Sequence, residues 1–209
     1  MKLFKLLTVL ILLIFGITAS ASALSIVNGS FETGDFTGWT QTSDGLGGYS
    51  TVTTSHAAFD GTIYSATDGQ YFANLSATSF IAQGQTWGAG YQLTFDWAFC
   101  ADDYLPFNDF SVFKVLDTGG SVIDNITLSD VAGIGDYGDT GWNEYTYTFA
   151  AAGAGSLQFG SVNGVDGIMD SNLLLDNVAA PVPEPASIFL MGVGLLGLVS
   201  NRKRFIKKS

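Results

Sequence analysis

The chain has 209 residues, with 8 Lys and Arg against 19 Asp and Glu, which gives a net charge of −11. Seven of the eight basic residues lie close to the two termini, so residues 24–181 carry 18 acidic side chains and one basic side chain, Lys114. Proteins bind nucleic acid through clustered Lys and Arg, and this charge pattern excludes that class of partner.

The first 23 residues have the pattern of a cleaved secretory signal peptide. Two lysines precede an apolar run over residues 6–17, and Ala21 and Ala23 fit the small-residue cleavage site. The alternative, an N-terminal membrane anchor, needs about 20 apolar residues, and this run is shorter. We expect signal peptidase to cut after Ala23 and the secretion machinery to export the rest.

Residues 24–180 are predicted to form one all-β domain, an antiparallel sandwich. Apolar and polar residues alternate in runs that are rich in aromatic and β-branched side chains and are bounded by Gly, Asp and Asn. The run over residues 117–120, Asp-Thr-Gly-Gly, predicts a hairpin turn, and no segment has a convincing amphipathic helical pattern. Short strands with regular turn signals favour a sandwich. The clearest strands are residues 91–100, 109–117, 143–151 and 156–164.

The body contains none of the usual catalytic motifs. His56 is the only histidine, and the sequence has neither a Gly-x-Ser-x-Gly elbow nor a His-Glu-x-x-His zinc motif. Cys100 is the only cysteine, which excludes an intrachain disulfide framework; a buried, inert thiol is favoured over intermolecular pairing. A glycosidase needs only two suitably spaced carboxylates, so a carbohydrate-active enzyme stays as the alternative. We expect a protein that is not an enzyme.

One acidic segment and two aromatic residues are candidates for ligand contacts. Asp102, Asp103, Asn108 and Asp109 bring together carboxylates that repel one another unless an ion or water neutralises them; a solvated loop is favoured over a cation site. Aromatic faces also bind sugars, although most aromatic residues of a sandwich fill its core. Trp87 and Tyr137 lie in Gly-rich segments and are therefore the better candidates for exposure among the aromatic residues.

The two ends of the body carry its most informative motifs. Ile26–Trp39 reads IVNGSFETGDFTGW, and Ser171–Ala180 reads SNLLLDNVAA. Together they resemble the opening and closing strands of the galactose-binding-like jelly roll, the fold of many carbohydrate-binding modules. The resemblance implies a jelly-roll sandwich and a structural calcium ion held by Glu32 and Asp176. Two carboxylates with backbone carbonyls suit a hard cation, and the alternative is that both are turn or edge acids without a metal.

The C-terminal segment, residues 181–209, combines a short motif, an apolar run and a basic tail. Val182, Pro183, Glu184 and Pro185 precede an uncharged run over residues 186–200, which would span about 22 Å as a helix. Arg202, Lys203 and Arg204 follow, and they would stay on the cytoplasmic side of a membrane. A lipid-anchor signal of the GPI type is the alternative, but its tail should be hydrophobic to the end.

This C-terminal segment resembles the PEP-CTERM sorting signal of Gram-negative bacteria. The resemblance implies that an exosortase recognises the Pro-Glu-Pro, that a transmembrane helix anchors the chain transiently in the inner membrane, and that processing then delivers the body to the cell surface. We therefore expect a secreted or surface protein with a structural or adhesive role in the exopolysaccharide of a biofilm. A carbohydrate-active enzyme, or its accessory binding module, is the alternative.

Overall fold

The computed structural model describes residues 24–43, 48–76 and 78–180. The predicted signal peptide and the predicted sorting segment, residues 1–23 and 181–209, lie outside the described residues. No helix in the described part of the chain has the length and apolar character needed to cross a membrane.

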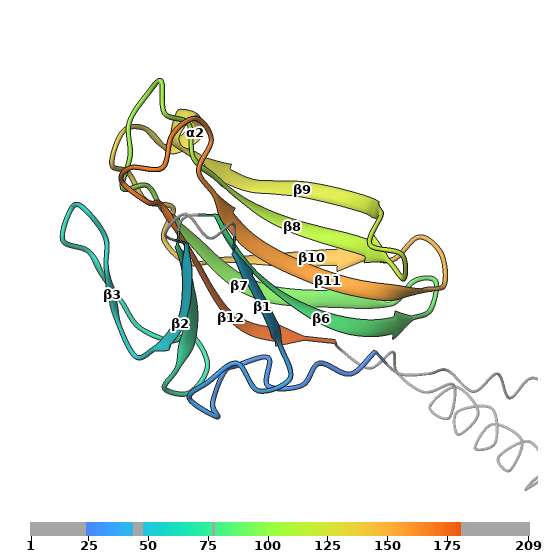
Figure 1. The fold of residues 1–209 in the computed structure, drawn as a ribbon. Coiled ribbons are helices and arrows are strands. Elements are labelled where there is room, and N and C mark those ends of the chain that lie inside the picture. Colours follow the sequence, from blue (N-terminus) through green and yellow to red (C-terminus); the bar gives the residue numbers. More distant parts are fainter. Residues whose placement is uncertain (1–23, 44–47, 77, 181–209) are drawn as a thin grey trace, which may run out of the picture.

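Two five-stranded antiparallel sheets form the body (Figure 1). The first sheet has the order β1 (Thr40–Ser43), β6 (Ser79–Trp87), β11 (Gly153–Val162), β8 (Phe110–Asp117), β9 (Val122–Asp130). The second sheet has the order β10 (Asn143–Thr148), β7 (Gln92–Cys100), β12 (Asn172–Ala179), β5 (Phe72–Ser76), β2 (Tyr49–Thr53). The prediction of an antiparallel jelly-roll sandwich is confirmed.

The core lies between the two sheets because alternate residues of each strand face inward. In the first sheet Phe113 and Phe159 are fully buried, and in the second sheet Phe95 is fully buried. The ring of Phe95 lies 4.9 Å from that of Phe159 and 5.2 Å from that of Phe113. These aromatic contacts between the sheets are worth about 0.5–1.5 kcal/mol per pair beyond the area that they bury.

The outer face of the second sheet is also partly covered. A short hairpin of β3 (His56–Ala57) and β4 (Ile63–Tyr64) contributes Ala58 and Tyr64 to a cluster with Phe72, Cys100 and Leu174. Cys100 is therefore fully buried and has no disulfide partner, and burial raises the pKa of its thiol. This agrees with the expectation of a buried, inert cysteine.

The predicted turn at Asp117 joins β8 to β9, where the amide of Gly120 donates to the carbonyl of Asp117 at 3.1 Å. One short helix, α2 (Val131–Ile134), follows β9. The Asp130 side chain caps this helix by accepting a hydrogen bond from the Gly133 amide at 2.8 Å.

The loops that follow the central strands gather at one end of the sandwich. Cys100 at the end of β7 pairs with Asn172 at the start of β12, and Ala179 at the end of β12 pairs with Thr94 near the start of β7. We call the loops over residues 101–109, 131–142 and 163–171 the loop end. The chain leaves β12 at the opposite end of the molecule (Figure 1).

Candidate functional site

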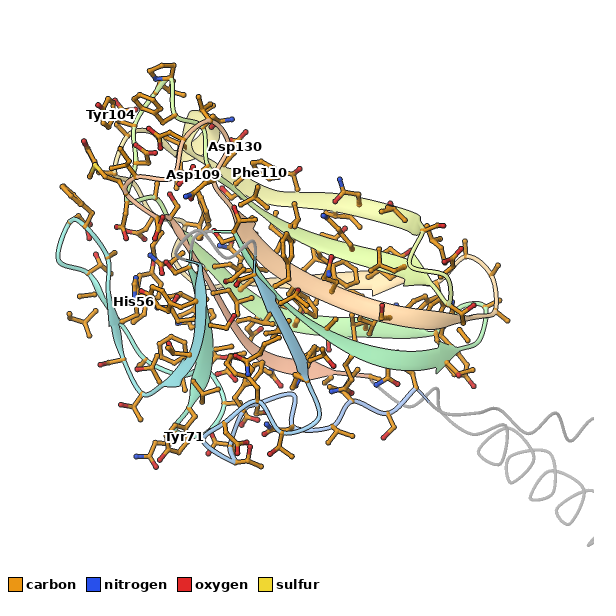
Figure 2. The ribbon with its side chains drawn as sticks, in the orientation of Figure 1. His56, Tyr71, Tyr104, Asp109, Phe110 and Asp130 are labelled. Atoms are coloured by element: carbon orange, nitrogen blue, oxygen red, sulfur yellow. The ribbon has the colours of Figure 1, made fainter. Side chains whose placement is uncertain are left out.

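Three aromatic rings from three separate segments form a surface beside the loop end. The ring of Phe59, in the turn of the β3–β4 hairpin, stacks on Tyr137 with a centroid distance of 4.2 Å and an interplanar angle of 20°. Tyr104 lies 5.8 Å from Tyr137. Phe59 is 57% exposed and Tyr104 is 38% exposed. We call Phe59, Tyr104 and Tyr137 the aromatic surface; Figure 2 shows Tyr104 at the outer edge of the molecule.

Backbone contacts hold this surface in place. The Tyr137 amide donates to the carbonyl of Asp103 at 3.0 Å, and the Leu105 amide donates to the Asp136 carboxylate at 2.9 Å. Tyr137 has a φ of 57°, in the left-handed region that is uncommon for a side chain of this size. The fold therefore imposes the conformation that places the Tyr137 ring against Phe59.

The acidic segment lies beneath the aromatic surface, and the prediction of a solvated loop is wrong for two of its four polar residues. Asp103 and Asp109 are each 2% exposed. Asp109 accepts hydrogen bonds from the amides of Gly164 at 3.1 Å and Ser171 at 3.2 Å. These bonds attach residues 163–171 to the segment that follows β7, a long-range contact that no local pattern indicates.

The remaining members of the acidic segment have individual partners. The carboxamide oxygen of Asn108 accepts from the Ala132 amide at 2.7 Å, which ties this segment to α2. Asp102 accepts from the Asn172 carboxamide at 2.9 Å. Burial raises the pKa of Asp102 to about 6, with the neighbouring Asp170 and Asp109 adding to the rise and the Asn172 hydrogen bond opposing it. Burial likewise raises the pKa values of Asp103 and Asp109.

Glu32 and Asp176, predicted as calcium ligands, both contact the loop over residues 67–71. The Oε1 atom of Glu32 accepts hydrogen bonds from the amides of Gln70 at 2.8 Å and Tyr71 at 2.7 Å. The Oδ2 atom of Asp176, which is fully buried, accepts from the amides of Thr67 at 2.7 Å and Asp68 at 3.0 Å. The structure therefore brings the opening motif and the closing strand to one loop.

The donor set around this loop can be compared with the needs of a calcium ion. Both oxygens of Asp176 accept amide hydrogens, whereas Glu32 uses only Oε1 toward the described residues, so that its second oxygen is free for an ion. Gly69 has a φ of +75°, and an added Cβ there would lie 2.4 Å from the Glu32 carboxyl carbon. Within residues 24–43, 48–76 and 78–180, no three His, Cys, Asp or Glu side chains are placed to hold a metal together. Backbone carbonyls and water would have to complete the shell.

Trp87, a candidate for exposure from the sequence, is buried. Trp87 is 5% exposed, and its ring stacks on Phe149 at a centroid distance of 4.8 Å. It ends strand β6 opposite Gly153, where an added Cβ would lie 2.9 Å from the indole nitrogen. Gly153 therefore provides the space in which the indole packs.

His56, at the start of β3, is half-buried. Its Nδ1 atom is 3.2 Å from the carboxamide nitrogen of Asn74, and burial lowers its pKa. Its Nε2 atom is buried and has no hydrogen-bond partner in the described part of the chain. Nothing there positions the imidazole as a base for a reacting group.

Sequence reasoning identified Tyr137 but missed Phe59 and Tyr104, which complete the aromatic surface. Phe59 reaches Tyr137 because the β3–β4 hairpin folds over the second sheet. The sequence signal for this hairpin is weak, since each of its strands has two residues. Tyr104 stands next to the acidic segment, and its position there was the one available clue.

Comparison with known proteins identifies the C-terminal segment. Residues 181–204 match the family model of the PEP-CTERM protein-sorting motif. The chain therefore carries this motif, which implies an exported protein that is processed at the cell envelope. The four predicted motif residues, Val182 to Pro185, and the basic residues Arg202 to Arg204 lie within the matched range. A search of curated proteins found no match.

Several solved structures resemble the body in fold. One is the K3 cleaved adhesin domain of Lys-gingipain from Porphyromonas gingivalis, with 16% identity and a TM-score of 0.49, covering 76% of this chain and 98% of that chain. Another is TmCBM61, solved with β-1,4-galactotriose, with 19% identity and a TM-score of 0.47, covering 78% and 100%. A third is the CBM22-1 xylan-binding domain of Xyn10C from Paenibacillus barcinonensis, with 16% identity and a TM-score of 0.45, covering 78% and 97%.

Proposed function

We propose that the protein is exported, processed by an exosortase at Val182-Pro183-Glu184-Pro185 and delivered to the surface or extracellular matrix of a Gram-negative bacterium, where its loop end binds exopolysaccharide. Its role is structural or adhesive within a biofilm and not enzymatic. The sorting part of the proposal rests on the match of residues 181–204 to the PEP-CTERM motif. The binding part rests on the aromatic surface.

The stacked pair of Phe59 and Tyr137 is the observation that carries the binding proposal. A pyranose ring presents C–H groups on its flat face, and an exposed aromatic ring offers an apolar plane of similar size. Polar groups that receive hydroxyl protons are also needed, since sugar sites combine apolar walls with a few placed acceptors. Asp136 lies beside Tyr137 in the chain. Within the described residues its carboxylate accepts one hydrogen bond, from the Leu105 amide to Oδ1, and it can therefore also receive a hydroxyl proton.

The position of the aromatic surface in the fold fits a surface protein. β12 starts at the loop end and finishes at the opposite end of the sandwich, from which the chain continues toward the Pro-Glu-Pro. A body held by this C-terminal segment would therefore present Phe59, Tyr104 and Tyr137 away from the point of attachment. A matrix polysaccharide could reach them without passing the membrane.

The buried acids near this surface serve the structure in our proposal. Asp109 is 2% exposed, and its two oxygens accept the amides of Gly164 and Ser171, so that this carboxylate holds two segments of the chain together. A glycosidase needs two carboxyl groups facing a substrate across about 5–10 Å. We therefore propose binding without hydrolysis. We also propose a structural calcium ion at Glu32 and Asp176, which would join the opening motif to the closing strand.

Affinity electrophoresis in gels that contain purified matrix exopolysaccharide tests the binding proposal. Tyr104→Ala and Phe59→Ala should each weaken binding by at least about tenfold, which corresponds to about 1.4 kcal/mol. Tyr49→Ala, at an edge-strand tyrosine that is 48% exposed, is the matched control and should bind like the wild type. Equal retardation of all variants would overturn the proposal. Release of reducing ends from the polysaccharide would favour the alternative function, a carbohydrate-active enzyme.

A further inference from the structure

Two acidic residues, Asp102 and Asp170, lie just beyond the end of the ladder between β7 and β12. The ladder between these strands closes with Cys100 paired to Asn172. Continuing this antiparallel register by two residues places Asp102 opposite Asp170, on the same face as the Asn172 side chain. The Asn172 carboxamide nitrogen donates to Asp102 Oδ2 at 2.9 Å and to the Asp170 carbonyl at 3.1 Å. Like charges directly opposite each other destabilise a sheet unless something neutralises them.

Two buried oxygen atoms beside this pair have no donor. Asn172 is 3% exposed, and its Oδ1 atom is buried without a hydrogen-bond partner among the described residues. Asn163 donates from its carboxamide nitrogen to Asp170 Oδ1 at 3.0 Å, and its own Oδ1 atom is also buried and unpartnered. Each asparagine thus directs its amino group to a carboxylate and leaves an acceptor unsatisfied. Native structures rarely leave such oxygens without a proton donor or a cation.

No basic side chain can neutralise this group from within the described part of the chain. Lys114 is the only Lys or Arg of residues 24–180, and its ammonium group lies 5.0 Å from the centroid of the Phe80 ring on the first sheet. Asp102 and Asp170 lie just beyond the end of the second sheet. Within residues 24–180, therefore, no Lys or Arg supplies a positive charge to this group.

We propose that Asp102, Asp170, Asn163 and Asn172 bind a divalent cation, with calcium as the expected ion. Carboxylate and carboxamide oxygens are the ligands that hard cations prefer, and calcium accepts an irregular shell completed by water. Only two of the four residues are acids, so this set is compatible with the absence of any metal-holding group of three His, Cys, Asp or Glu within residues 24–43, 48–76 and 78–180. It is separate from Glu32 and Asp176, which contact the loop over residues 67–71.

The ion would fix the loop end. Asp170 and Asn163 belong to the loop after β11, whereas Asp102 follows β7. A shared ion would add a third link between these segments to the two that Asp109 already makes through Gly164 and Ser171. The loop over residues 163–171 would then become rigid on binding calcium.

Equilibrium dialysis against radioactive calcium tests the proposal on the full chain purified in detergent and stripped of metal. At about 1 mM free calcium, the range for extracellular modules, Asp102→Asn and Asp170→Asn should each bind one ion fewer than the wild type. Both substitutions keep the size of the side chain and an acceptor oxygen for the asparagine that it contacts. Asp166→Asn, in the same loop and with the same loss of charge, is the matched control and should bind like the wild type.

Two results would overturn the proposal: a wild-type chain that binds no calcium, or Asp102→Asn and Asp170→Asn variants that bind as many ions as the wild type. Glu32→Gln separates the two sites, because calcium lost in this variant alone would belong to the loop over residues 67–71. If a variant does not fold, amide hydrogen exchange of the wild type decides. Calcium should slow exchange at least tenfold within residues 163–171, and unchanged exchange there would contradict the proposal.

Discussion

Val178 donates its backbone amide to the carbonyl of Gly29 at 3.0 Å, so the closing strand is hydrogen-bonded to the turn of the opening motif. The contact is tight on the side-chain side as well, since an added Cβ at Gly29 would lie 1.9 Å from the Val178 carbonyl oxygen. A glycine is therefore required at this position by its neighbour and not by a special φ. The two ends of the body are joined where the chain enters and leaves the fold.

Gly29→Ala should accordingly lower the free energy of unfolding by about 2–4 kcal/mol, because the backbone of β12 or of the turn must move to admit the methyl group. Urea unfolding followed by tryptophan fluorescence measures this change. Gly167→Ala is the control, because an added Cβ at Gly167 meets no atom within 4 Å; it should change stability by less than about 0.5 kcal/mol. A Gly29→Ala protein as stable as the control would show that the backbone around Gly29 and Val178 can move to admit the methyl group without loss of stability.

The proposed calcium ion at Glu32 and Asp176 predicts a thermal shift. Calcium at about 100 times its dissociation constant should stabilise the fold by about 2.7 kcal/mol. For a domain of this size that corresponds to a rise in Tm of about 5–10 °C. Measured by differential scanning fluorimetry, the part of this rise that comes from the loop over residues 67–71 should disappear in Glu32→Gln. A rise in Tm of the same size in Glu32→Gln and in the wild type would show that no calcium ion binds at Glu32.

The sole histidine predicts a pH dependence of stability. Burial lowers the pKa of His56 below its ordinary value of 6.5, so in acid the unfolded chain takes up a proton that the folded chain does not. This contribution to stability is fully present above pH 6.5 and is lost as the pH falls from there toward the folded pKa. An NMR titration of the single imidazole should give a pKa below 6.5. A measured value at or above 6.5 would mean that the ring is exposed to solvent.

Tyr64 attaches the β3–β4 hairpin to the loop end. Its hydroxyl donates to the Asp139 carboxylate and accepts from the Gly141 amide at 3.0 Å, and burial together with the Asp139 bond raises the pKa of the phenol. Tyr64→Phe removes both bonds and should destabilise the fold by about 1–3 kcal/mol. Tyr49→Phe, at an exposed tyrosine, serves as the control in the same chemical denaturation. Equal midpoints for the two variants would count against this role of Tyr64.

Strands in which apolar and polar residues alternate clearly were predictable from the sequence, and strands without this alternation were not. Residues 91–100 and 109–117 become Gln92–Cys100 and Phe110–Asp117, because period-two patterns with aromatic residues fit a half-buried strand. The hairpin of β3 and β4 could not be predicted, since its position depends on Tyr64 contacting Asp139, 75 residues further along the chain.

Burial of polar groups was the main feature that local patterns could not indicate. Asp103 and Asp109 lie in a segment that reads as a solvent-exposed acidic loop, and only the amides of Gly164 and Ser171, far along the chain, explain the burial of Asp109. Trp87 shows the opposite error, because its glycine neighbours indicated exposure whereas Gly153 makes room for its indole. The contact of Glu32 and Asp176 with one loop was anticipated only through the resemblance to jelly-roll modules.

The intact mass of the protein recovered from the cell envelope and the medium of the producing bacterium tests export and sorting most directly. We predict a mature chain that begins at Leu24 and ends near the Pro-Glu-Pro at residues 183–185, and that carries the whole body with its aromatic surface. A mass that extends through Ser209 in the mature, membrane-held protein would contradict this, because the tail would then be a permanent anchor.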